Sequence, residues 1–372
     1  PPVVNFVEPY LHCIPNFSYT QDMATLHKTT AFTKKILKWS TLTVIAIVLV
    51  AGGLRVGTQI KEYFFPTPLP PPTVKFDKLP RLIFPESAVN LSSKELTYTL
   101  NTTSGQLPNL PTQTQVFKIS KSSPSLLALQ RAQEQVLKIG FNSPPTRIQN
   151  ALYQWANQDT PPKKLLLDIV SLNFSLSSDF LSDQDILSAK NLPDENGAIE
   201  TAKNFFSNIS FPQDIDTQKT KTTLLKIASG KLTDATSLST AQVIRVDFFQ
   251  KDVDGRPIHY PNPQNSIMYA LISAGTFTPQ VIEAKFFHYN INEVSSTYPI
   301  KTAEEAFSEL KTAKAYIASY FGNETNISIK NISLGYYLSE EEQNYLMPII
   351  VFEGNNGFFA YVEAIKGEWT EK

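Results

Sequence analysis

The chain has 372 residues, a formal net charge of −1 and a single cysteine. Such a balanced charge lacks the basic footprint of proteins that bind nucleic acids or anionic lipid surfaces, and we expect no nucleic-acid partner. One cysteine excludes a disulfide-stapled scaffold and a zinc–thiolate site. With 42% hydrophobic and 18% charged residues, the composition is typical of a folded chain with a packed core.

The first 22 residues, Pro1–Asp22, show no periodic pattern and contain the single cysteine, Cys13. The first methionine is Met23, and MATLHKTTAFTKKILKW is typical of a natural, short and basic N-terminus. We therefore interpret residues 1–22 as a non-native or disordered extension without a folded role. The alternative is a tail that carries a reactive thiol. Residues 23–38 are interpreted as a short basic cytoplasmic segment.

The segment Trp39–Ile60 carries no charge until Arg55 and is apolar along most of its length. As a helix it reaches roughly 33 Å, about one hydrocarbon thickness, and Trp39 stands where an interfacial aromatic residue belongs. We predict a single-pass transmembrane helix over residues 39–60. A buried core helix is one alternative. A cleavable signal peptide is the other, with Leu42–Val50 as its apolar region and Ala51–Gly53 as its cleavage site. We favour the anchor because apolar residues continue to Ile60.

Basic residues are concentrated on the N-terminal side of this helix. The positive-inside rule therefore predicts a cytoplasmic N-terminus and an extracytoplasmic location for the long C-terminal part, in a protein of the cell membrane. The residues concerned are Lys28, Lys34, Lys35 and Lys38.

Proline dominates the segment that comes after the helix. Five of the eight residues Pro66–Thr73 are prolines, which predicts an extended, semi-rigid spacer of roughly 25 Å. A ligand for an SH3-type domain is the alternative. We assign residues 61–85 to this spacer, and we expect Val74–Pro85 to leave it and lie along the folded part. Residues 86–372 are long enough for two domains, which we place at 86–190 and 191–372.

Three helices are predicted from cap residues and helical spacing. The first begins at Ser123–Pro124 and stops at Gly140, the second begins near Asp194, and the third begins with a capping box of Thr302 and Glu305. Their apolar stripes run from Leu126 to Leu137, from Ala198 to Ile209 and from Ala303 to Ile317.

Strands separate the helices. In Gln242–Gln250, Ile244, Val246 and Phe248 fall on one face and Val243, Arg245 and Asp247 on the other, and Asp254–Gly255 then marks a hairpin turn. We interpret the C-terminal part as α+β, with irregular repeats of a helix packed on antiparallel sheets. The other predicted strands are Leu96–Leu100, Gln115–Ile119, Leu165–Leu176, Ile267–Ser273, Val281–Tyr289, Ile327–Tyr337, Leu346–Glu353 and Phe358–Ile365.

Three stretches of the C-terminal half resemble a known family. They are VIRVDFFQKDVDGRPI (Val243–Ile258), the capped helix KTAEEAFSELKTAKAYI, and ISLGYYLSEEEQNYLMPIIVFEG (Ile332–Gly354). Together, over about Val243–Ile365, they resemble the extracytoplasmic part of the YycH/YycI proteins, whose folds are related to PepSY-like domains. Those proteins are single-pass regulators of a sensor histidine kinase that controls the cell wall. The resemblance implies an α+β fold, one anchor and a protein partner in the envelope.

Few residues are candidates for chemistry. His259 and His288 fall in or beside strand patterns, and we interpret both as hydrogen-bonded structural histidines. Asp252–Val–Asp254–Gly255 resembles the start of a calcium loop but lacks the later ligands, so we expect a hairpin turn.

Two further motifs have ordinary explanations. Ser308–Glu–Leu–Lys311 fits S-x-x-K but lies mid-helix on a polar face, and no K-T-G comes after it. Glu340–Glu342 is either a solvated turn or an acidic docking patch for a basic partner. We therefore assign no catalytic, cofactor-binding or metal-binding residue and expect no cofactor.

Three functional hypotheses remain. We favour a membrane-anchored, non-enzymatic module that regulates an envelope process by protein contact. The alternatives are a structural or adhesive surface protein, and an envelope hydrolase whose site is not recognised. A hydrolase should assemble titratable residues in one cleft, whereas an interaction module should expose an apolar or aromatic face.

Overall fold

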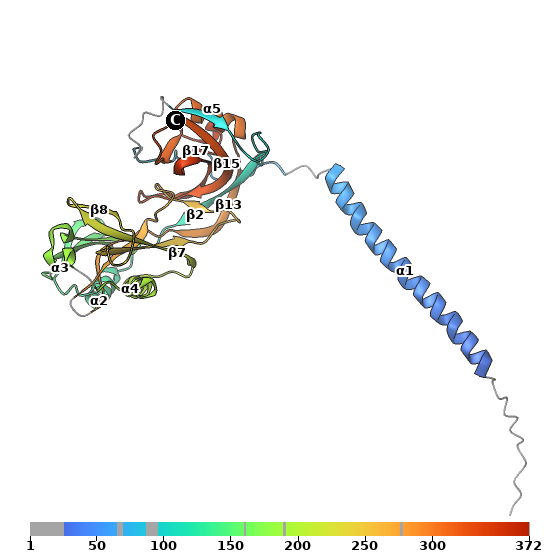
Figure 1. Ribbon diagram of the computed structural model, residues 1–372, viewed down its shortest axis with the longest axis horizontal. Coiled ribbons are helices and arrows are strands. Elements are labelled where there is room, and N and C mark those ends of the chain that lie inside the picture. The colour runs from blue at the N-terminus through green and yellow to red at the C-terminus, as the bar shows by residue number, and fades with distance from the viewer. Residues whose placement is uncertain are drawn as a thin grey trace, which may run out of the picture. The chain divides into compact units, whose positions relative to one another are not determined.

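The computed structural model describes residues 26–64, 70–86, 96–159, 161–188, 191–275 and 278–371 (Figure 1). The chain divides into two compact units, with the division between Pro71 and Pro72. The predicted extension at residues 1–22 lies outside the described residues, as do residues 65–69 of the predicted spacer.

Among the described residues of the first unit there is one helix, α1, Leu26–Phe64. Within it, Thr33–Gly53 is a 21-residue stretch with a mean hydropathy of 1.8, long and apolar enough to cross a membrane. Helices of this kind near an N-terminus serve as membrane anchors or as signal sequences. The predicted helix at Trp39–Ile60 is thus confirmed as a helix, and α1 extends beyond it at both ends.

The second unit contains a nine-stranded sheet in which every pair of neighbouring strands is antiparallel. Five of its nine strands come from the C-terminal side of residue 191 and four from the N-terminal side. In spatial order they are β3 (Thr146–Gln149), β4 (Leu152–Ala156), β5 (Lys163–Asp168), β6 (Phe174–Ser178), β12 (Gln280–Phe286), β11 (Met268–Ser273), β9 (Val243–Gln250), β7 (Ile215–Ala228) and β8 (Lys231–Asp234).

The other sheet has eight strands and is mixed. β1 and β10 run parallel to opposite ends of β15, whereas all other pairs are antiparallel, so our expectation of purely antiparallel sheets fails here. The strands are β1 (Thr97–Leu100), β15 (Asn326–Tyr337), β16 (Tyr345–Gly354), β17 (Phe359–Glu363), β14 (Tyr316–Ser319), β10 (Ile258–His259), β13 (Asn290–Pro299) and β2 (Gln113–Ser120).

Few helices cover these sheets, and the unit belongs to the α+β class, as predicted. α2 (Ala128–Lys138) and α4 (Glu195–Ser207) contribute to the core of the nine-stranded sheet, and α5 (Ala303–Lys311) packs on the eight-stranded sheet (Figure 1). α3 (Gln184–Leu187) is a single turn. Short 3-10 turns occur at Phe180–Ser182, Asn355–Gly357 and Gly367–Trp369.

The side chains of β9 alternate between the two faces of the nine-stranded sheet, as its sequence predicts. Val246 and Phe248 join the core that contains Phe206 of α4, whereas Val243 joins a smaller cluster on the other face. That smaller cluster also contains Leu225, Leu271 and Phe180. The period of two in β9 therefore gave the correct buried face.

Two helix boundaries differ from the prediction. α2 begins at Ala128, because Ser125 accepts hydrogen bonds from the backbone N–H groups of Leu127 and Ala128 and forms a turn first. Leu126, placed on the predicted stripe, is fully exposed. α5 ends at Lys311, because Ala313 adopts a left-handed conformation with φ of 59°. By contrast, the Asp194 cap of α4 and the capping box of α5 are confirmed.

The predicted strand Leu165–Leu176 is two strands, β5 and β6, joined by a turn. The Asp168 Oδ1 atom accepts hydrogen bonds from the backbone N–H groups of Val170 and Ser171, and Leu172 has a φ of 62°. Such an aspartate turn reverses the chain without glycine or proline. Because the usual turn residues are missing, the apolar sequence was predicted as one continuous strand.

The boundary predicted between residues 190 and 191 does not coincide with a division between the sheets. β6 pairs with β12 in the nine-stranded sheet, and β2 pairs with β13 in the eight-stranded sheet. Each sheet therefore mixes strands from both sides of the predicted boundary, and Pro72–Lys372 forms one compact unit. Long-range strand pairing of this kind leaves no mark in local sequence patterns.

An extended segment, Thr73–Phe84, binds along this unit, and we call it the strap. The Val74 N–H donates to the Thr297 carbonyl of β13 at 3.1 Å. Leu79, which is fully buried, donates its N–H to the Trp369 carbonyl and accepts at its own carbonyl from the Glu371 N–H. The expectation that this proline-containing segment lies along the folded part is confirmed.

We predict that the docking of α5 holds the eight-stranded sheet together. Phe307 and Leu310 are buried, so Phe307→Ala with Leu310→Ala should each cost about 2–5 kcal/mol and together unfold the unit, whose stability is of the order of 5–15 kcal/mol. Thr302→Ala removes one cap and should cost only about 1 kcal/mol. Thermal melting followed by circular dichroism measures these changes. Ser308→Ala, on the exposed side of α5, is the control, and equal small effects from all variants would contradict the packing described.

Candidate functional site

The loop that joins β15 to β16 contains the acidic run of the sequence, and we call Ser339–Asn344 the acidic turn. It is held from within by two side chains. The Tyr289 hydroxyl lies 2.9 Å from both the Ser339 and the Glu341 carbonyls, and the Gln343 Oε1 atom accepts the Ser339 N–H at 3.0 Å. The backbone of the turn is therefore fixed, while its three glutamates are exposed.

Two lysines bind the acidic turn, Lys121 directly after β2 and Lys285 of β12. The Lys121 Nζ atom lies 2.5 Å from Glu342 Oε1, and the Lys285 Nζ atom lies 2.8 Å from Glu340 Oε1. These side chains are 34–76% exposed, and ion pairs of this kind contribute about 0–1 kcal/mol. Because both ion pairs are this weak, an incoming cation can take the place of either lysine at small cost in free energy. Glu341 forms no ion pair with any described residue.

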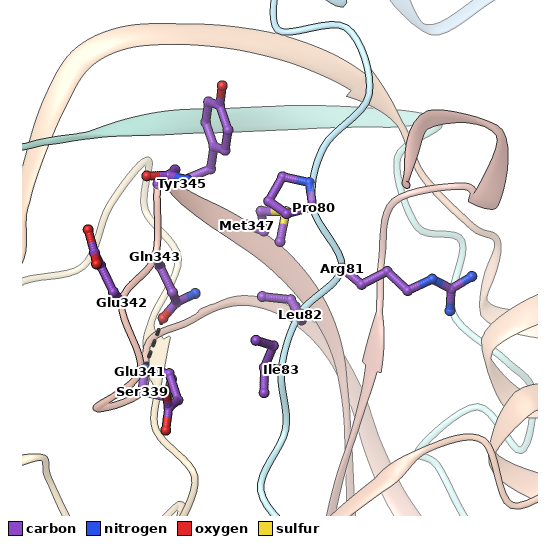
Figure 2. Close-up of a pocket in the computed structure, with 11 residues that line it drawn as sticks. Pro80, Arg81, Leu82, Ile83, Ser339, Glu341, Glu342, Gln343, Tyr345 and Met347 are labelled. Atoms are coloured by element: carbon purple, nitrogen blue, oxygen red, sulfur yellow. Dashed lines mark hydrogen bonds between the residues drawn. The ribbon is translucent and has the colours of Figure 1, made fainter. Parts of the chain in front are cut away.

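A small pocket of about 90 Å³ lies between the acidic turn and the strap (Figure 2). Leu82 and Ile83 of the strap face the turn, whereas Arg81 points away and donates from Nε to the Glu371 carbonyl at 3.2 Å. Ile83 is 66% exposed, so an apolar side chain stands at the surface beside the carboxylates. Met347 and Tyr345 complete the wall on the side of β16.

A larger hollow of about 620 Å³ also borders the acidic turn, and we call it the intersheet groove. Glu342 and Gln343 line both hollows. Residues of β4, β5 and β6 in the nine-stranded sheet and of the end of β2 in the other sheet line the groove. Apolar side chains in it include Leu152, Leu166 and Phe287, and charged ones include Lys121, Asp168 and Glu340.

His288 lines this groove and pairs with a carboxylate. Its Nε2 atom is 2.7 Å from Asp214 Oδ1, and its backbone N–H donates to the Asn173 side chain. Burial alone would raise the pKa of Asp214, but hydrogen bonds from His288 and Gln250, together with the charge of His288, outweigh it and lower the pKa. His288 is hydrogen-bonded, as expected. No described hydroxyl or thiol is hydrogen-bonded to His288.

His259 differs from the expectation that it is hydrogen-bonded. It lies in β10 against Gly335 and near the ring of Tyr361, at 5.6 Å between centroids, and its buried Nε2 atom has no hydrogen-bond partner among the described residues. A Cβ atom at Gly335 would stand 2.4 Å from the imidazole ring, so glycine is needed for this contact. Burial lowers the pKa of His259 to about 4, against a smaller opposing effect of Asp252.

The other sequence candidates lie apart from the groove. Asp254 and Gly255 form the hairpin turn that was predicted, with φ of 52° and 68°. In the S-x-x-K motif, Ser308 is exposed on α5. The Lys311 ammonium lies 4.3 Å from the centre of the Phe307 ring. Within the described ranges, no group of three or more His, Cys, Asp or Glu side chains is placed to hold a metal ion.

Sequence reasoning missed the groove as a feature. Its walls come from residues 119–124, 149–175, 287–290 and 340–343, which only strand pairing brings together. The acidic run was the one signal in the sequence that pointed here, as the alternative of a docking patch.

Comparison with known proteins adds little. No protein-family model matches the chain, and a search of curated proteins finds no match. Among solved structures, the chain is similar to an uncharacterized protein from Eubacterium rectale ATCC 33656, with 14% identity and a TM-score of 0.32. That similarity covers 70% of this chain and 86% of the other. A similarity at this TM-score carries no functional argument, and the function is therefore inferred from the geometry and the sequence of this chain.

We predict that His259 makes the folded unit sensitive to mild acid. Because its pKa falls from 6.5 in the unfolded chain to about 4 in the fold, folding keeps the imidazole neutral, and stability is lost as the pH falls from 6.5 towards 4. The loss should reach about 3 kcal/mol. Urea unfolding at several pH values would show this slope in the wild type and a shallower one in His259→Gln, which cannot take up the proton. Identical slopes would contradict the assignment.

Proposed function

We propose that the chain is a membrane-anchored extracytoplasmic module that regulates or assists another protein of the cell envelope by direct contact. In this proposal the N-terminus is cytoplasmic and Trp39–Ile60 crosses the membrane once. The predicted spacer of residues 61–85 is shorter, since α1 continues to Phe64 and the strap begins at Thr73; the proline-rich stretch between them acts as the spacer, and the unit that begins at Pro72 lies outside the membrane. The proposal assigns no catalytic residue and no cofactor.

The intersheet groove is the observation that carries the binding part of this proposal. It combines apolar side chains with charged ones whose ion pairs are weak and exposed, which are the properties of a surface that exchanges partners. The His288–Asp214 pair beside it has the contacts of a structural pair. A groove of this composition suits the capture of a polypeptide better than a chemical reaction.

The strap supports the tethering part of the proposal. It comes directly after the proline-rich segment in the chain and is bonded to β13 at one end and to the C-terminal residues farther along. Phe84, at the end of the strap, packs on Tyr316 and Tyr337 with ring centroids 5.2 and 4.8 Å apart. Because the strap packs on the core in this way, it connects the proline-rich segment firmly to the folded unit.

The resemblance to the YycH/YycI proteins suggests the kind of partner. Its three stretches correspond to β9 with its hairpin turn, to α5, and to β15 and β16 with the acidic turn between them. We therefore propose a sensor kinase of the envelope, or a protein associated with one, as the partner. This identity remains a prediction.

The topology gives the direct test of the anchoring part. The full chain, tagged at its C-terminus, should stay in the membrane fraction through carbonate and high-salt washing, because burial of apolar residues is insensitive to charge screening. Protease added outside intact cells or spheroplasts should degrade the unit from Pro72 onward. Survival of that unit, or a mature chain that begins near Leu54, would show that the proposed topology is wrong.

A further inference from the structure

We infer that the intersheet groove binds an extended segment of a partner protein in which apolar side chains alternate with lysine or arginine. This inference rests on the proposed function and specifies the chemistry of its partner. The groove offers such a segment apolar side chains, carboxylates and uncharged polar side chains.

The apolar part of the groove lies on one face of the nine-stranded sheet. Leu152 and Asp168 stand opposite each other on β4 and β5, and Leu166 stands opposite Ser175 of β6. Since residues two apart along a strand share a face, Leu152 and Leu166 lie on the same face of the sheet. Both are half-buried, as is Phe287, and no other segment of the described chain covers them completely. An extended peptide laid on this face presents alternate side chains towards it, and apolar ones among them can contact both leucines.

The charge of the groove favours basic side chains at the polar positions of such a peptide. Asp168, Glu340 and Glu342 line it against a single lysine, Lys121, and Lys285 binds Glu340 from β12. Two neutral backbone N–H groups, rather than a cation, hold the Asp168 carboxylate. Negative charge is therefore in excess, and a basic segment is complementary whereas an acidic one is repelled.

Polar side chains along the groove suit the backbone of a bound segment. The Ser175 hydroxyl and the amides of Gln149 and Asn290 also line it. An extended backbone presents unpaired N–H and C=O groups that such side chains can bond. Lipid phosphates and nucleic acids lack this match, because the carboxylates would repel them.

A phage-displayed library of random dodecapeptides, panned against the full chain in nanodiscs of phosphatidylcholine, tests the inference. The enriched peptides should alternate apolar residues with lysine or arginine. Their synthetic forms should bind the full chain in fluorescence anisotropy, with affinity that falls as salt rises. Glu340→Lys with Glu342→Lys should weaken binding at least about tenfold, and Leu166→Ser should weaken it through the apolar part of the groove.

The controls separate a groove effect from loss of fold. Glu200→Lys with Glu324→Lys makes the same change of charge at two exposed positions outside the groove and should leave the affinity unchanged. The glutamates of the acidic turn are also exposed, so their replacement leaves the core intact, as circular dichroism would verify. Enrichment of acidic peptides, no enrichment, or equal affinity for groove and control variants would overturn the inference. Because the protease test does not involve the groove, failure here leaves the proposed topology standing.

Discussion

The pairing of β6 with β12 is the constraint on which the rest of the folded unit depends. It places Phe174 opposite Phe286, more than a hundred residues later in the chain, with the two rings stacked at 5.7 Å between centroids. Phe206 of α4 packs against both rings and closes the core over this junction. Aromatic cross-strand contacts of this kind add to the burial of area and fix the register of the strands. Without this pairing the nine-stranded sheet would split in two, and the intersheet groove would not exist.

The same junction sets the position of the acidic turn. The chain leaves β12 through Phe287, His288 and Tyr289, so the pairing that aligns Phe286 also brings Phe287 to the groove and the Tyr289 hydroxyl to the backbone of the turn. The turn is thus held by a residue that comes shortly after β12, and two of its glutamates, Glu340 and Glu342, line the groove. On its other side the strap contributes Leu82 and Ile83 to the small pocket (Figure 2). The strap and the groove therefore both border the acidic turn.

Local chemistry explains which parts of this fold could be predicted from the sequence. The capping box of Thr302 and Glu305, the Asp254–Gly255 turn and the alternation in β9 all act within a few residues, and each was predicted correctly. The start of α2 was missed because the Ser125 turn competes with the expected cap. The domain boundary and the groove depend on pairings between distant strands, which local patterns cannot report. The unpartnered Nε2 atom of His259, among the described residues, was missed for the same reason, since its surroundings come from β15 and β17.

Hydrogen exchange of the full chain in rising denaturant, followed by mass spectrometry, tests most directly that β6 and β12 belong to one cooperative core. The account predicts that amides of β5 and β6 open together with those of β9, β11 and β12, with the same free energy and the same dependence on denaturant. The edge strand β3 should open earlier, because fraying at an edge requires no loss of the core. Opening of β3–β6 as a separate unit of lower stability, with β12 still protected, would contradict the single core and the groove that depends on it.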